Sequence, residues 1–125
     1  MFHIQYINNS DGSTLQGVSI NTLGVYVTQG IDISRNTEGG AIGAVITGTM
    51  GAVTKQYSWD NINFYNAYDM LGTDISQVAD IKNSRIVSLY NTDTSDVMAP
   101  YMRLKFSGTG VITGITSLIY MQKEY

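Results

Sequence analysis

The fold is decided by residues 101–121, which read YMRLKFSGTGVITGITSLIYM. Met102, Leu104 and Phe106 alternate with polar or charged residues, a pattern typical of a β-strand that buries one face. Residues 111–121 are apolar on both faces, so we expect a strand covered on both sides, by its own domain or by a partner. The Ser-Gly-Thr-Gly sequence between the two stretches predicts a turn, and we expect the two strands to pair as a hairpin.

Shorter stretches with β periodicity recur through the rest of the chain. We expect further strands over residues 2–6, 15–20, 25–34, 41–49, 52–57 and 84–90. The second can pair back on the first, and the third is predicted to be one continuous strand because its odd-numbered residues are mostly apolar. One short helix is predicted near residues 74–81, with Thr73 or Asp74 as its N-cap.

About seven or eight short strands, with turn signals every ~8–12 residues, predict an antiparallel β-sandwich or jelly roll. The 125 residues match the size of one domain, and neither an internal repeat nor a Pro/Ser-rich linker divides them. We therefore expect an all-β protein with a single domain over residues 1–125.

The composition limits the classes of function. Charged residues make up 14% of the chain, against about 25% in typical domains, and such a surface suits a subunit that packs into an assembly. The 7 basic residues are scattered, which disfavours nucleic-acid binding. No run approaches the ~20 apolar residues of a transmembrane helix, and the first residues lack a signal-peptide pattern. We expect a soluble protein made in the cytoplasm, with no membrane contact.

Side chains suited to catalysis are scarce. The chain has no Cys, which excludes disulfides and thiolate nucleophiles. His3 is the only imidazole and lies on the polar side of its strand, and no G-x-S-x-G sequence supports a catalytic triad. Glu38 and Glu124 are the only Glu residues that could serve a glycosidase-type carboxylate pair. We expect neither an enzyme nor a bound cofactor.

Two groups of oxygen-bearing side chains are candidate calcium ligands. One comprises Asp93 and Asp96, and the other comprises Asp60, Asn61 and Asn63. Neither has the spacing of an EF-hand, and Asp and Asn in turns ordinarily bond nearby backbone N–H groups. We therefore favour loop capping over metal binding.

Residues 57–71 lose the alternation, and we interpret them as a long ordered loop rich in aromatic and Asn/Asp residues. Flat apolar rings beside short polar groups are typical of protein interfaces and of sugar-binding surfaces, although such rings can also simply cap the end of a sandwich. All three readings stay open. The candidate binding residues are Tyr57, Trp59, Asp60, Asn61, Asn63, Phe64, Tyr65 and Tyr68.

Residues 101–114, YMRLKFSGTGVITG, resemble the closing hairpin of small virion proteins of tailed bacteriophages. In those proteins an aromatic-x-Arg-apolar strand leads through Ser/Thr-Gly-Thr-Gly into a final Thr/Gly-rich strand. The likeness covers about a tenth of the chain. It implies a β-sandwich component of the virion, such as a capsid decoration or cement protein.

These observations lead to one expectation and two alternatives. We expect a structural protein of a phage particle that binds the major capsid protein or other virion proteins, associates with its own copies as a homo-oligomer, and resides in the virion. The first alternative is a carbohydrate- or receptor-binding module of a tail or fibre, with Trp59 and neighbouring Tyr residues as stacking platforms. The second is a small hydrolase.

Overall fold

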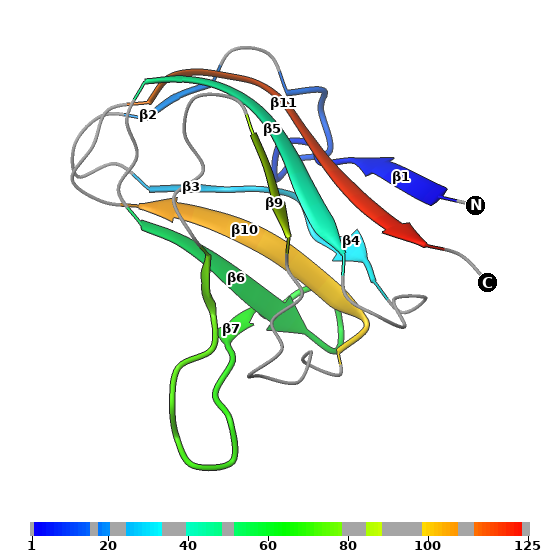
Figure 1. The fold of residues 1–125 in the computed structure, drawn as a ribbon, viewed down its shortest axis with the longest axis vertical. Coiled ribbons are helices and arrows are strands. Elements are labelled where there is room, and N and C mark those ends of the chain that lie inside the picture. Colours follow the sequence, from blue (N-terminus) through cyan, green and yellow to red (C-terminus); the bar gives the residue numbers. More distant parts are fainter. Residues whose placement is uncertain are drawn as a thin grey trace.

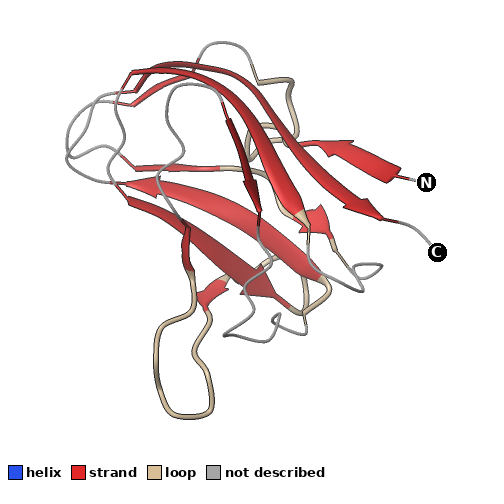
Figure 2. Ribbon diagram, viewed as in Figure 1, coloured by secondary structure: helices blue, strands red, loops and turns tan. Residues whose placement is uncertain are grey.

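The computed structural model describes residues 2–15, 18–20, 25–33, 40–48, 52–78, 85–88, 99–107 and 112–123. Within these segments the regular elements are all β-strands, and every strand pair is antiparallel. The strands form two sheets that face each other as the layers of a sandwich (Figures 1 and 2). The prediction of an all-β antiparallel sandwich is confirmed.

The first layer, which we call the β11 sheet, has five strands arranged around β11. They are β1 (Phe2–Tyr6), β2 (Val18–Ile20), β5 (Ala41–Gly48), β9 (Arg85–Ser88) and β11 (Ile112–Lys123). The order is β1-β11-β5-β9, and β2 pairs with the first part of β11 while β1 pairs with its last part. The segment that was expected to pair back on the first strand therefore pairs with β11.

The second layer, which we call the β10 sheet, has six strands arranged around β10 and β6. They are β3 (Val25–Val27), β4 (Ile31–Asp32), β6 (Ala52–Ser58), β7 (Tyr65–Asn66), β8 (Gln77–Val78) and β10 (Tyr101–Ser107). The order is β3-β10-β6-β7. In addition, β4 pairs with a different part of β10 from β3, and β8 pairs with a different part of β6 from β7.

The core lies between the two layers. Met102, Leu104 and Phe106 are buried on alternate positions of β10, as the sequence predicts, and Leu118 and Tyr120 face them from β11. Full burial of such a side chain contributes about 1.5–3 kcal/mol, so these rows hold the layers together. The other buried apolar residues are Ile7, Leu15, Ile31, Ile33, Ile42, Ala44, Val53 and Ile115.

The predicted hairpin between the two C-terminal strands is wrong. β10 and β11 belong to different sheets, although they are neighbours in the sequence. Each has other antiparallel partners on both edges: β3, β4 and β6 beside β10, and β1, β2 and β5 beside β11. The apolar rows of the two strands therefore meet face to face across the core, because two strands that each bury an apolar row can share it without pairing.

The predicted continuous strand over residues 25–34 is also wrong, because it divides into β3 and β4. Between them the Thr28 hydroxyl accepts a hydrogen bond from the Leu104 N–H at 2.9 Å, in the place of a backbone carbonyl. Tyr26 and Thr28 lie toward the core before this point, and Ile31 and Ile33 after it. The buried phase thus shifts by one residue, which the sequence alternation does not reveal.

The predicted helix near residues 74–81 is wrong for the residues that the structure describes. Asp74 closes a local turn, since its carboxylate accepts a hydrogen bond from the Ser76 N–H at 2.7 Å. The chain then continues as a strand: Ser76 O accepts from the Lys55 N–H at 2.8 Å, and β8 pairs with β6. The edge of β6 offers these residues backbone partners that an isolated helical turn does not have. Residues 79–81 lie outside the described residues.

Candidate functional site

The eight residues proposed as a binding site lie on or beside a segment that leaves β6 and returns to it as β8. We call residues 59–76 of this segment the arm. Figure 1 shows the arm extending away from both sheets after β7 before the chain returns toward β6. The structure agrees with the predicted long loop over 57–71, except that β6 continues to Ser58 and the two-residue strand β7 interrupts the loop.

The Asp60 carboxylate closes the base of the arm. It accepts hydrogen bonds from the Ser58 hydroxyl at 2.8 Å and from the backbone N–H groups of Ile62 and Asn63 at 2.9 Å each. Its other oxygen accepts from Asn63 Nδ2 at 3.1 Å. The backbone hydrogen bonds from Asn63 and Ile62 hold the pKa of Asp60 well below its ordinary value. Loop capping, the role favoured from the sequence, is the role of this carboxylate.

The base of the arm lies directly against Gly30, in the connection between β3 and β4. A Cβ atom at position 30 would lie 2.1 Å from Asn61 Oδ1 and 2.6 Å from Phe64 Cζ, well inside van der Waals contact. Asn61 itself has a φ of 60°, in the left-handed region that Asn enters more readily than most residues. The missing side chain at position 30 is what allows the arm to dock against the β10 sheet.

A chain of polar and aromatic contacts fixes the arm on the outer side of β10. The Arg103 guanidinium carbon lies 4.6 Å from the centre of the Phe64 ring, a cation–π contact. Arg103 Nε also donates to Gln56 Oε1 at 2.9 Å, and Gln56 Nε2 donates to Asn66 Oδ1 at 3.2 Å. Phe64 and Asn66 of the arm are thus joined to β10 through the Arg103 guanidinium and to β6 through the Gln56 amide.

Two of the predicted rings form a stacked pair above this base. The Trp59 and Tyr65 ring centroids are 5.1 Å apart, and their planes are inclined by 13°. The stack covers one face of each ring, but Trp59 remains 71% exposed. The pair therefore presents a rigid aromatic surface to the surroundings.

The far end of the arm is a tight hairpin with an apolar tip. Asp69 N donates to Thr73 O at 2.9 Å, and the Asp69 carboxylate accepts from the Leu71 and Thr73 N–H groups at 2.9 Å each. Gly72 takes a φ of 85°, which a residue with a side chain rarely adopts. Met70 and Leu71, at the turn, are 98% and 88% exposed, so they contribute nothing to the core of this chain.

Buried Ser76 ties the two limbs of the hairpin together. The Ala67 N–H donates to the Ser76 hydroxyl at 2.5 Å, and this hydroxyl donates to Ala67 O at 3.1 Å. The Ile75 N–H also donates to Ala67 O, at 2.9 Å. The apolar tip is therefore carried by limbs that are hydrogen-bonded to each other and, through Ser76 O, to β6.

The structure separates one predicted site residue from the others and adds three. Tyr57 is partly buried and packs against the core, whereas Tyr68 is exposed on the arm. Ile62, Met70 and Leu71 are exposed apolar residues of the arm that the sequence reasoning missed. Two apolar residues between an Asp and a Gly were the available signal, because Asp and Gly at those positions are typical of a turn tip.

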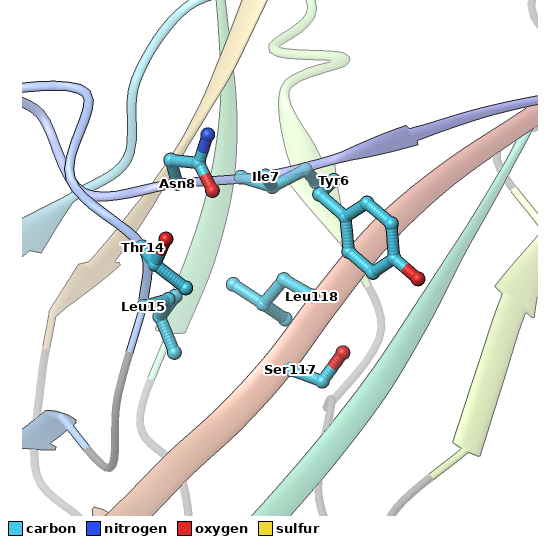
Figure 3. A pocket seen from close by; sticks show the side chains of 7 residues that line it. All are labelled: Tyr6, Ile7, Asn8, Thr14, Leu15, Ser117 and Leu118. Carbon is cyan, nitrogen blue, oxygen red and sulfur yellow. The ribbon is translucent and has the colours of Figure 1, made fainter.

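A separate pocket of about 440 Å³ opens where β1 and β2 leave part of β11 between them. Figure 3 shows its lining residues, which come from three segments of the chain: Tyr6, Ile7, Asn8, Thr14, Leu15, Ser117 and Leu118. Leu15 and Leu118 are buried, and none of the lining side chains is charged. The pocket suits a small neutral group. No sequence motif marks it, since its lining residues are brought together only by the sheet.

The remaining candidates for chemistry fall outside the described parts of the structure. The backbone of His3 belongs to β1, but its side chain is not described, and Glu38, Glu124, Asp93 and Asp96 lie in undescribed segments. Within the described residues, no group of three His, Cys, Asp or Glu side chains could hold a metal ion. The same residues contain no helix with the length and apolar character needed to cross a membrane.

Comparison with known proteins identifies no relative. No protein-family model, curated protein or solved structure matches this chain. The class of protein is therefore defined by the structure alone: a two-layer β-sandwich with a protruding, apolar-tipped arm.

Proposed function

We propose that this protein is a structural subunit of a phage particle that docks onto a neighbouring virion protein through the arm. The observation that carries the proposal is the exposure of Met70 and Leu71 at the tip of a hairpin whose backbone is held by Asp69 and Ser76. Met70 and Leu71 lie outside the core on a hydrogen-bonded hairpin. Exposed apolar side chains of this kind contribute a favourable free energy only when another surface buries them.

The polar groups of the arm favour a protein partner over a sugar. The carboxylates of Asp60 and Asp69 accept hydrogen bonds from the backbone of the arm itself. The exposed large apolar side chains of the arm are Trp59, Ile62, Tyr65, Tyr68, Met70 and Leu71. Burial of this surface stabilises a complex by about 25 cal/mol per Å² before association costs, and many weak copies on one lattice bind more tightly through avidity.

The assignment to a virion rests on two further supports. The sequence of residues 101–114 resembles that of the closing hairpin of small tailed-phage virion proteins, and the all-β sandwich is the fold that this resemblance implies, although β10 and β11 do not pair as a hairpin in this chain. The capsid lattice, through its major capsid protein, is the partner that the resemblance implies. Decoration or cementing of the capsid is accordingly the activity that we propose.

A binding experiment with virus particles tests this proposal. Purified protein is mixed with particles of the encoding phage that lack it, and the bound fraction is measured by sedimentation. We expect binding at a fixed ratio of copies per particle. A variant with Met70→Ser and Leu71→Ser should bind at least tenfold more weakly, because it loses the apolar tip without losing core contacts.

Val25→Ser provides the matched control, because Val25 is an exposed apolar residue of β3 away from the arm. It should bind like the unchanged protein, and circular dichroism should show the same fold for all three proteins. Undiminished binding of the tip variant would show that the arm is not the docking surface. Failure of the unchanged protein to bind the particles would reject the virion role.

The exposed face of Trp59 supports a second candidate, a carbohydrate- or receptor-binding module. A ring that is 71% exposed and backed by Tyr65 can stack on the apolar face of a sugar. A glycan array would give a signal that Trp59→Ala abolishes and Ile62→Ala retains. The absence of any glycan signal would reject this candidate.

A further inference from the structure

The outer face of the β11 sheet carries a continuous apolar surface that the proposed function does not use. The strand register places Tyr6 opposite Ile119, Ile119 opposite Gly43, and Gly43 opposite Ile86. Directly opposed residues in antiparallel strands share a face, so these four form one row across β1, β11, β5 and β9. Tyr6 and Ile86, at the two ends of the row, are 72% and 71% exposed.

A second row runs parallel to the first. Ile4 lies opposite Met121, and Met121 opposite Ala41. Ile4 is exposed, as is Val45 further along β5 on the same face. The described side chains of this face carry no charge, and the register position of Lys123 lies at its margin, two residues beyond Met121.

The outer face of β11 bears on how this strand is covered, which the sequence leaves open. The last strand is predicted to be covered on both faces, by its own domain or by a partner. On the inner face, Leu118 and Tyr120 of β11 are buried in the core. On the outer face, Ile119 and Met121 lie among exposed apolar neighbours. None of the residues that the structure describes covers this outer face, which leaves it open to a second molecule.

Charge and shape favour a second copy of this chain as that molecule. A two-fold contact requires a surface that matches itself, and an uncharged apolar face meets this condition where a face of one charge sign would repel its copy. A two-fold axis between β11 and β5, parallel to them, maps the first row onto itself. It places Tyr6 of each copy over Ile86 of the other, and Ile119 over Gly43.

The available area is somewhat below that of a standard specific interface, which fits a weak and reversible dimer. Tyr side chains bury roughly 150–250 Å² each, and the four large exposed side chains with their half-buried neighbours offer roughly 500–700 Å² per copy. A standard specific interface takes about 800 Å² from each partner. Sheets packed face to face at about 10 Å keep their strands within about 30° of each other, which leaves this row aligned with its copy.

We infer that the protein forms a two-fold dimer in which the outer faces of the two β11 sheets pack against each other. The arm belongs to the opposite sheet, so each dimer leaves two arms available for docking. The inference adds to the proposed function and does not depend on it, since self-association needs no particle.

Sedimentation velocity over a range of protein concentrations tests the inference. We expect a reversible equilibrium between monomer and dimer. Ile86→Lys and Ile4→Lys, at opposite margins of the face, should each raise the dissociation constant at least tenfold, because each buries a charge against an apolar copy. Val25→Lys, an equal change at an exposed position of the β10 sheet, should leave the dissociation constant unchanged.

Three results would overturn the inference: a monomer at every concentration up to the millimolar range, a dimer that Ile86→Lys leaves intact, or a dimer that Val25→Lys weakens equally. The variant with Met70→Ser and Leu71→Ser separates this inference from the proposed function. It should lose particle binding and keep the dimer, and loss of the dimer would place self-association on the arm.

Discussion

On the arm, a few polar side chains hold the exposed apolar residues in place, whereas on the outer face of the β11 sheet the strand register does so. Asp60, Asp69 and Ser76 bond the backbone of the arm and leave Trp59 and the tip outside. On the sheet face, Tyr6 and Ile86 are exposed because the pairing of four strands places them there.

Because of this difference, we expect different substitutions to disrupt the arm and the sheet face. A surface fixed by local hydrogen bonds can be moved by one substitution at its base, while the rest of the sandwich stays in place. A surface fixed by register persists until the sheet itself changes. Substitutions at particular positions should therefore separate the arm from the sheet face.

The largest effect on stability is expected from a substitution in the core, because both the arm and the sheet face depend on the packing of the two layers. Leu104→Ala removes a fully buried side chain of β10 and should lower the free energy of unfolding by about 2–5 kcal/mol. Urea unfolding measures this loss, and particle binding and dimer formation should both decline. Val25→Ala, at an exposed site, serves as the control. A loss below about 1 kcal/mol would mean that the two layers do not depend on this row.

Gly30→Ala is expected to disturb the arm alone. The added Cβ would overlap Asn61 Oδ1 and Phe64 Cζ, so these two side chains have to turn away from position 30, which disturbs the docking of the arm. We expect a loss of about 1–3 kcal/mol in stability, a changed Trp59 fluorescence and weaker particle binding. The dimer dissociation constant should stay the same. Fluorescence identical to that of the unchanged protein would argue against close docking of the arm at Gly30.

Gly43→Ala is the matching change for the sheet face and should have a smaller effect. Its Cβ would lie 2.9 Å from Ile119 Cγ1, and Ile119 can turn outward because it lies on the open face. We expect a stability loss of about 1 kcal/mol and a measurable change in the dimer dissociation constant. Particle binding by the arm should be unaffected. A change in particle binding would show that the two surfaces are coupled.

The smallest effect is expected from acid, and it should be confined to the arm. The pKa of Asp60 is depressed in the folded protein, so its contribution is present above the ordinary value of 3.8 and is lost as pH falls through the lower folded value. The near-ultraviolet circular dichroism of the Trp59–Tyr65 stack should thus stay constant down to about pH 4 and decline only below it.

Asp60→Asn is the control for this titration. It should weaken the same signal at neutral pH and remove its dependence on acid, because an amide at this position does not titrate. A decline of the signal already near pH 5 in the unchanged protein would contradict the role given to this carboxylate.

The sequence predicts the parts of this fold that depend on one strand at a time. The alternation of Met102, Leu104 and Phe106 identifies β10 and its buried face, and the apolar pattern of β11 indicates a strand whose inner residues, Leu118 and Tyr120, are buried. The pairing of strands does not follow from these patterns, because β10 and β11 each bury an apolar row whether they lie side by side or in opposite layers. The predicted hairpin fails for this reason.

The sequence predicted most of the residues of the candidate site but not how they are arranged in space. Trp59 and Tyr65 form a pair, but Tyr57 packs against the core, because Tyr57 still belongs to β6 whereas Trp59 lies beyond Ser58, the last residue of that strand. The tip residues Met70 and Leu71 were missed, because the reading of the loop selected aromatic and Asn/Asp residues and passed over the turn signal of Asp69 and Gly72. The contact of Gly30 with Phe64 joins distant segments and leaves no local signal.

The central position of β11 has a consequence for biosynthesis. β1, β2 and β5 all precede β11 in the chain, and each of them relies on it for an edge. The ribosome therefore releases three strands before the one that joins them. β5 can pair with β9 earlier, but the layer stays incomplete until translation reaches β11 and joins β1 and β2 to it, which lengthens the period in which a chaperone can engage the nascent chain.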